Sequence, residues 1–375
     1  MNREEFKLRL AARLAALSDE ERTEVFNYID ECLDEAIENG ESEIEALERL
    51  GDPDEAARQL FADRETKSAT PEQTEAFVNS YDPAELRGMR ITAREAGINV
   101  TSAEIGTIRV KYDVHKEEEF KVSVEDGVLV VKEWVPQRWM LWLKAIINLG
   151  WEGKRWVIEL DLPKQFGGFI ELESSNHSLT VERINVNSLF ARTSNGRIIV
   201  DSVKSAGELT VTSSNGTTSL RNSSTAGNVR VETSNGRAEA DNVDCGGDMT
   251  VRTSNGRLTI ESSTATSINA KTSNGGASLT QVTAEKELAV KTSNGAIEVD
   301  AVSAGKHIKL TSSNSSITGR LSGSASQYTI VTRTSNGKAL PPSGGSGPTH
   351  LEATTSNGRI SLDFEKPYKL TFTDE

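Results

Sequence analysis

The sequence predicts a mainly β protein, a parallel β-solenoid (β-helix) of about ten ~20-residue coils, with a small N-terminal all-α domain. A tetrapeptide recurs at nearly constant spacing through the last two thirds of the chain, and apolar residues alternate on both sides of it. Residues 1–63 instead show helical periodicity. Only 36% of the 375 residues are hydrophobic, which suits a thin rod with a narrow core.

Residues 1–63 are predicted to form four helices. Phe6, Leu10 and Leu14 lie at helical spacing, Ser18–Glu21 and Ser42–Glu45 are capping boxes, and Asp52 precedes a proline at the first position of the last helix. Residues 1–65 hold 8 Lys/Arg and 20 Asp/Glu, which is −12 of the total charge of −14. Such an acidic domain favours basic protein partners, and the acidic balance argues against nucleic-acid binding.

This helical segment carries recognisable motifs. The runs Ala36-Ile37-Glu38-Asn39-Gly40 and Leu50-Gly51-Asp52-Pro53 resemble the HAAS signalling-associated domain of bacterial proteins. The resemblance implies a helical interaction or signalling adaptor, with a protein partner bound through residues 1–63. The residues alone also allow an acidic helical cap without such a role. Residues 64–88 lose the periodicity and are predicted to be a linker.

The repeat is a (Thr/Ser)-Ser-Asn-Gly unit in residues 171–364. Its Asn residues are 19 to 22 residues apart, and flanking apolar pairs such as Leu209/Val211 and Ile198/Val200 predict two short strands per unit. The Thr or Ser two residues before each Asn points inward, where stacked hydroxyls could bond to one another or to the backbone. We expect the Asn-Gly pairs to form sharp corners with positive φ. The Asn residues are 176, 195, 215, 235, 255, 274, 294, 314, 336 and 357, and the candidate corner residues are Asn195, Gly196, Asn215, Gly216, Asn235, Gly236, Asn255, Gly256, Asn274, Gly275, Asn294 and Gly295.

An antiparallel Asn-Gly hairpin meander is the competing arrangement. The solenoid is favoured because the register persists over ten units while outward residues vary. From about Ile91 to Phe364 the chain resembles the bacterial "putative adhesin" family of β-strand-repeat proteins, including Glu125–Val130 and Leu162-Pro163. The resemblance implies the fold, whereas the adhesin label is not a demonstrated activity. Relatives that pair the two domains often carry a membrane helix between them, and residues 64–88 show none.

The repeats carry an outward stripe of charge. Acidic residues six positions after many of the Asn residues suggest either a carboxylate ladder for a cation or catalytic pair, or ion pairing, both between coils and within a coil, with arginines two positions after the Asn. The recurrence of Arg197/Asp201, Arg237/Asp241 and Arg257/Glu261 favours ion pairing. The four histidines are scattered in sequence, and no metal or nucleophile constellation is evident. We therefore predict a non-enzymatic protein without catalytic residues, cofactor or metal.

Residues 89–170 are predicted to form a β cap, interrupted by a tryptophan-rich insertion over 134–156. This insertion has three interpretations: it covers the open end of the solenoid, it contacts a membrane interface, or it binds a partner. The candidate contact residues are Trp139, Trp142, Leu143, Ile146, Ile147 and Trp151.

Two cysteines and the lack of an apolar leader predict a cytoplasmic protein, peripheral to a membrane if the insertion binds lipid. The expected function is a scaffold or binding protein in which an adhesin-like solenoid is coupled to a signalling module, in envelope-associated signalling. The alternatives are a carbohydrate-binding or polysaccharide-acting β-helix, or a solenoid that self-assembles. The sequence specifies neither the ligand nor the oligomeric state.

Overall fold

The computed structural model describes residues 2–14, 22, 26, 29, 30, 33, 42–50, 52–54, 76–94, 96–113, 120–133 and 157–365. These residues fall into two compact units, a helical unit up to Asp54 and a β unit from Ala76 onward. Among the described helices, none is both long and apolar enough to cross a membrane.

The helical unit contains α1 (Arg3–Arg13) and α3 (Glu43–Leu50). Asn2 caps α1 by accepting the Glu5 N–H at 2.8 Å, and Phe6, Leu10 and Leu14 are fully buried along one stripe. The predicted capping box at the start of α3 is confirmed: the Ser42 N–H donates to Glu45 Oε2 at 3.0 Å, and the Glu45 N–H donates to Ser42 Oγ at 3.3 Å.

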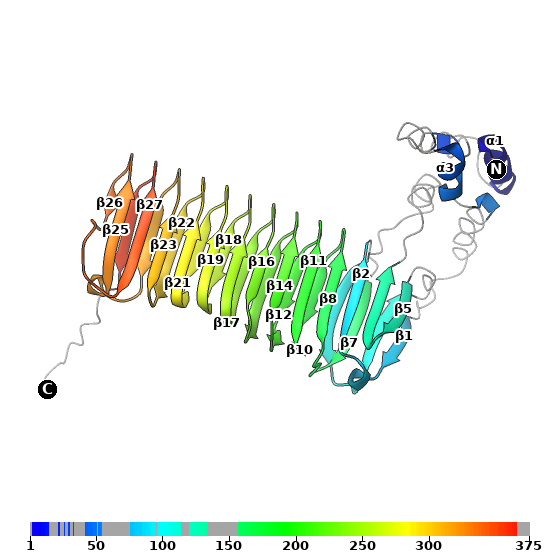
Figure 1. Ribbon diagram of the computed structural model, residues 1–375, viewed down its shortest axis with the longest axis horizontal. Helices are drawn as coiled ribbons and strands as arrows, with labels where there is room; N and C mark the ends of the chain where they lie inside the picture. The colour runs from blue at the N-terminus through cyan, green and yellow to red at the C-terminus, as the bar shows by residue number, and fades with distance from the viewer. Residues whose placement is uncertain are drawn as a thin grey trace, which may run out of the picture. The chain divides into compact units, whose positions relative to one another are not determined.

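The β unit is a parallel β-solenoid, as predicted, and its strands stack in register from one coil to the next (Figure 1). Leu189 of β11 (Ser188–Thr193) pairs with Leu209 of β14 (Leu209–Ser213), which pairs with Val229 of β16 (Val229–Glu232). The strands of one repeat therefore pair with those of neighbouring coils and not with each other, which excludes the hairpin meander. One continuous hydrophobic core runs through the stack.

Each coil has three strand positions, where two were predicted. The first row contains β8 (Phe169–Ser174), β11 (Ser188–Thr193), β14 (Leu209–Ser213), β16 (Val229–Glu232), β23 (His307–Thr311), β27 (Thr349–Thr355), β25 (Tyr328–Thr334) and the last residues of β17 (Ala238–Arg252), β19 (Thr264–Lys271) and β21 (Thr283–Lys291). The second row contains β9 (Leu179–Glu182), β12 (Ile198–Asp201), β18 (Leu258–Glu261), β20 (Ala277–Thr280), β24 (Ile317–Leu321), β28 (Ile360–Phe364), β26 (Ala339–Leu340) and the first residues of β15 (Thr218–Thr225), β17 and β22 (Ile297–Ala304). The short third row begins at β10 (Asn185–Val186) and β13 (Lys204–Ser205) and continues through the remaining parts of β15, β17, β19, β21 and β22.

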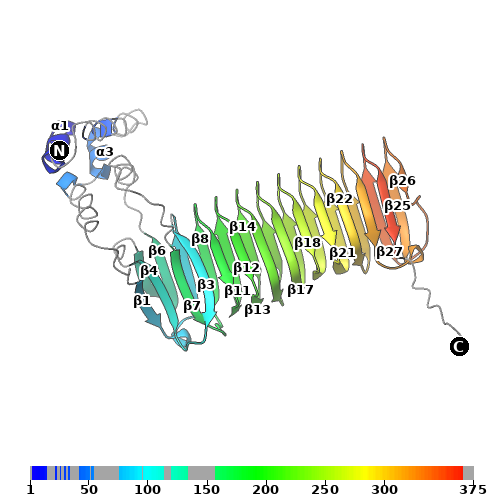
Figure 2. The ribbon, with the colours of Figure 1, turned by 180° about the vertical axis from the view of Figure 1, so that it is seen from behind.

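The coils at the C-terminal end do not follow sequence order. The coil of β27 and β28 lies between the coil of β23 and β24 and the coil of β25 and β26. Figure 2 labels β25, β26 and β27 at this end of the stack. The chain therefore builds the outermost coil first, beginning after η4 (Ala325–Gln327), and then returns to fill the gap. The segment after β26 covers the outer edge of β25, because Ile330 and Gly344 exchange backbone hydrogen bonds of 2.7 and 2.9 Å.

The N-terminal end has the same arrangement. The coil of β2 (Gly88–Ala93) and β3 (Gly97–Ala103) lies between β8/β9 and the outer coil of β6 (Val128–Glu133) and β7 (Val157–Pro163). The predicted cap thus contributes two further parallel coils, flanked by antiparallel strands β1 (Ala76–Tyr81), β4 (Ile108–Asp113) and β5 (Phe120–Glu125). Residues 76–88, assigned to the linker from sequence, contain β1 and η2 (Pro83–Glu85). β1 pairs antiparallel with β4, and its sequence, Ala-Phe-Val-Asn-Ser-Tyr, has no clear apolar alternation from which a strand could be predicted.

Candidate functional site

The repeated asparagines form a continuous side-chain ladder along one corner of the solenoid. From Asn195 onward each Asn Nδ2 donates to the Oδ1 of the Asn one coil away, at 2.6–2.9 Å, and Asn176 accepts the first of these bonds. The ladder follows the spatial coil order, so Asn336 donates to Asn357, and Asn357 donates to Asn314. Because each amide is used by its neighbours, the ladder primarily fixes the register of the coils.

The buried hydroxyls before each Asn bond to the backbone. In one coil the Thr253 hydroxyl donates to Gly236 O at 2.9 Å and accepts the Gly256 N–H at 3.1 Å. Thr233, Thr272 and Thr292 make the same two contacts in their own coils. Each hydroxyl therefore ties its corner to the preceding coil, which is one of the two arrangements expected from the sequence.

The prediction of positive φ at the Asn-Gly corners is wrong. The corner residues lie at bends, but left-handed residues occur seven positions after each Asn from Asn176 to Asn294. The repeat glycines favour close stacking, because a Cβ on any of them would overlap the backbone of an adjacent coil unless the corner shifts. One coil has Ser315 at this position and still keeps the Asn314–Asn294 ladder bond at 2.8 Å. The left-handed residues in the repeats are Arg183, Ser202, Asn222, Asn242, Ser262, Gln281 and Ala301, with φ of 46–56°.

The outward charges stack as predicted, but the predicted pairs within a coil do not form in the described structure. Arg197 and Asp201 stand at opposite ends of a short strand, four residues apart, which is ~13 Å at ~3.3 Å per residue. The pairing between coils that was also predicted does form, as in Arg320 with Asp300 at 2.9 Å. The pairs Arg237/Asp241 and Arg257/Glu261 have the same four-residue spacing and the same outcome.

Two of the histidines that are scattered in sequence lie side by side in the fold. His307 of β23 pairs in register with His350 of β27, and their ring centroids are 6.4 Å apart in an edge-to-face arrangement. They line a cleft of about 490 Å³ on the outer face of the first strand row. Its lining residues are Lys306, His307, Thr329, Val331, Arg333, His350, Leu351 and Glu352. Sequence reasoning missed this cluster because the two histidines are 43 residues apart.

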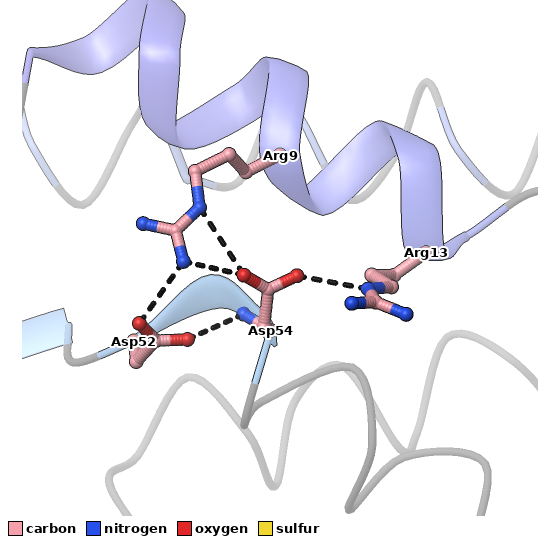
Figure 3. A network of polar contacts seen from close by, with 4 residues as sticks. All are labelled: Arg9, Arg13, Asp52 and Asp54. Atoms are coloured by element: carbon pink, nitrogen blue, oxygen red, sulfur yellow. Dashed lines mark hydrogen bonds and ion pairs between the residues drawn. The ribbon is translucent and has the colours of Figure 1, made fainter.

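In the helical unit, a polar network joins α1 to the residues after α3 (Figure 3). Arg13 Nε donates to Asp54 Oδ1 at 2.8 Å, and Arg9 bridges Asp54 and Asp52, with 3.2 Å to Asp52 Oδ2. The Asp54 N–H donates to Asp52 Oδ1 at 2.8 Å, as expected for a capping aspartate before the buried Pro53. Hydrogen bonds from Arg13 and Arg9 lower the pKa of the Asp54 carboxyl.

The candidate contact residues Trp139, Trp142, Leu143, Ile146, Ile147 and Trp151 lie outside the described residues. Within the described ranges, no group of three or more His, Cys, Asp or Glu is arranged to hold a metal ion. Cys245 is buried, its thiol lies 3.4 Å from the carbonyl oxygen of Gly227, and burial raises its pKa.

Known proteins resemble both parts of the chain. Residues 8–59 match the HAAS family, and residues 86–363 match the Toastrack DUF4097 family, a domain of unknown function. No curated protein matches the chain. The similar crystal structures include a "putative cell adhesion protein" from Clostridium sporogenes (11% identity, 78% of this chain and 100% of that chain, TM-score 0.25). Others are a "putative adhesin" from Bacteroides fragilis (11%, 78% and 98%, 0.31) and one from Parabacteroides distasonis (12%, 77% and 98%, 0.31). Because the family match spans residues 86–363 of 375, the protein belongs to the Toastrack DUF4097 family.

Proposed function

We propose that this protein is a non-enzymatic scaffold of the cytoplasm, acting in signalling at the cell envelope. In this proposal the helical unit binds a basic protein partner, and the solenoid is a rigid binding arm. The supporting observation is that the repeated polar groups of the solenoid bond to adjacent coils. The Asn amides and the buried hydroxyls hold the coils together, which suits a role as a scaffold.

The charges of the helical unit support a basic partner. The four basic residues of α1 pair with acids inside the unit: Arg3 lies 3.5 Å from Asp30, Lys7 also contacts Asp30, and Arg9 and Arg13 contact Asp54. Because residues 1–65 hold 20 acids and 8 bases, this pairing leaves a large acidic excess toward solvent.

Self-assembly through the C-terminal end of the solenoid is less well supported. Besides the Ile330–Gly344 bridge, the Thr332 N–H donates to Ser343 Oγ at 2.9 Å and the Gly347 N–H donates to Tyr328 O at 3.3 Å. The outer edge of β25 is therefore covered by the chain's own residues, which is how native sheets avoid edge-to-edge association.

The test is a charge-reversal experiment on the full chain. Glu4 and Glu48 are exposed in the helical unit, and Glu173 and Glu298 are exposed on the solenoid. The variant Glu4→Lys/Glu48→Lys is compared with Glu173→Lys/Glu298→Lys, since both pairs change the net charge equally. We expect a partner captured by the wild type to be lost by the first variant and kept by the second. Equal retention by both variants, or equal loss, would reject the helical unit as the partner site.

A further inference from the structure

The cleft around His307 and His350 lies on three adjacent strands near the C-terminal end of the solenoid. Figure 1 shows β23, β27 and β25 side by side there. In register, His307 lies beside His350 and then Thr329, while Lys309 lies beside Glu352 and then Val331. The depression arises because Thr329 and Val331 are short, whereas the residues around them have long side chains.

This end of the solenoid is basic, in contrast to the rest of the chain. Residues 301–351 contain no Asp or Glu but include Lys306, Lys309, Arg320, Arg333 and Lys338. Arg320 pairs with Asp300 and Lys309 with Glu352, just outside this segment, which leaves Lys306, Arg333 and Lys338 as a local excess of positive charge in a chain with a charge of −14.

The acid that lines the cleft is already neutralised. Lys309 Nζ lies 3.0 Å from Glu352 Oε2, so this pair adds no net charge. Lys306 and Arg333, in contrast, form no ion pair with any residue that the structure describes. The closest further acid in the register is Glu287 of β21, which lies on the side of His307 away from His350. The cleft therefore offers two unpaired cations.

The remaining polar groups are suited to a hydroxylated ligand. Imidazole nitrogens donate or accept hydrogen bonds, and the Thr329 hydroxyl, though it donates to Gly347 O at 2.7 Å, retains acceptor capacity. A volume of about 490 Å³ exceeds that needed for a lone inorganic anion. The lining contains no Phe, Tyr or Trp on which a nucleobase would stack.

We propose that this cleft binds a hexose-sized molecule bearing a phosphate or a carboxylate. Lys306 and Arg333 lie five residues apart in the strand register, at opposite ends of the cleft, so one of them binds the anionic group, while His307, His350 and Thr329 contact the hydroxyls. The inference rests on the proposed binding function of the solenoid and gives that function a ligand class. It is separate from the partner site of the helical unit.

The test is isothermal titration calorimetry on the full chain with glucose 6-phosphate, glucuronate and glucose. We expect at least one of the two anions to bind and glucose to bind weakly or not at all. Which anion binds shows whether the ligand group is a phosphate or a carboxylate. Losing the charged hydrogen bond to the anionic group in Lys306→Ala/Arg333→Ala weakens binding about tenfold or more, and the two single variants show which cation makes it. Val331→Trp fills the cleft without changing the charge and also abolishes binding.

The matched control is Arg257→Ala, which removes an exposed arginine from another part of the solenoid and leaves binding unchanged. Three results would overturn the proposal: no binding of either anion at millimolar concentration, equal binding of glucose, or equal weakening by Arg257→Ala. The same variants are scored for retention of the helical unit's partner. Failure at the cleft with the partner retained would reject the ligand site and leave the scaffold function intact.

Discussion

The adjacent glycines Gly275 and Gly276 give a sharp test of how the coils are stacked. A Cβ at position 275 would overlap the carbonyl group of Gly256 in the preceding coil, whereas at position 276 the nearest atom, Ala296 O, is 3.4 Å away. Neither residue has a positive φ, so intrinsic backbone strain does not distinguish them. We expect Gly275→Ala to displace the corner from the preceding coil, and Gly276→Ala to leave it in place.

The expected cost follows from the bonds at that corner. Separating the coils stretches Thr272 Oγ1 to Gly256 O (3.2 Å), Asn274 N to Ser254 O (2.9 Å) and Asn274 Nδ2 to Asn255 Oδ1 (2.7 Å). At about 1 kcal/mol for each bond, Gly275→Ala destabilises the solenoid by about 3 kcal/mol.

The control acts in the opposite direction. Gly276→Ala is neutral or stabilises by up to about 1 kcal/mol, because alanine reduces the entropy of the unfolded chain. Urea unfolding measures the difference, and hydrogen exchange at the Asn274 amide localises it, since repeat arrays do not always unfold in one step. Equal urea midpoints for the two variants would refute the stacking argument.

The other predictions concern separate features. Asn255→Ala removes two ladder bonds and Asn336→Ala removes one, so we expect losses of about 2 and about 1 kcal/mol in urea unfolding; equal losses would contradict the ladder. Because Arg13 lowers the folded-state pKa of Asp54, their contact stabilises the helical unit above the unfolded carboxyl's pKa and is lost as the pH falls through the folded value. The α1 amide signals in NMR should therefore change on acidification below about pH 4, and constant signals would contradict this. Iodoacetamide should modify the buried Cys245 only in denaturant, as mass spectrometry would show; rapid modification of the native protein would argue against its burial.

Much of the solenoid could be predicted because the sequence pattern of its strands and corners repeats in each coil. Alternating pairs such as Leu209/Val211 recur on one face, and both residues are fully buried. The residues with positive φ, seven positions after an Asn, show no such repeated pattern in the sequence. This position is occupied by Arg183, Gln281 and Ala301 among others, and no glycine marks it, so the sequence pointed to the Asn-Gly pair instead.

The His307–His350 cluster could not be predicted for a topological reason. Neighbouring coils are normally about 20 residues apart, so a separation of 43 residues indicates coils that are not in contact. The two histidines become neighbours only because the coil containing Asn336 is placed at the end of the stack. The slightly longer spacings of 22 and 21 residues near that end are the one trace of this rearrangement in the sequence.

The out-of-order coil also determines how the solenoid resists mechanical force. Tension applied beyond Phe364 acts on β27 and β28, which are hydrogen-bonded to a coil on each side. This coil cannot peel away from an open end, as the last coil of a sequentially ordered stack would. Pulling it out requires the strand pairings on both of its sides to break together. We therefore expect this coil to resist a force applied from the C-terminal side.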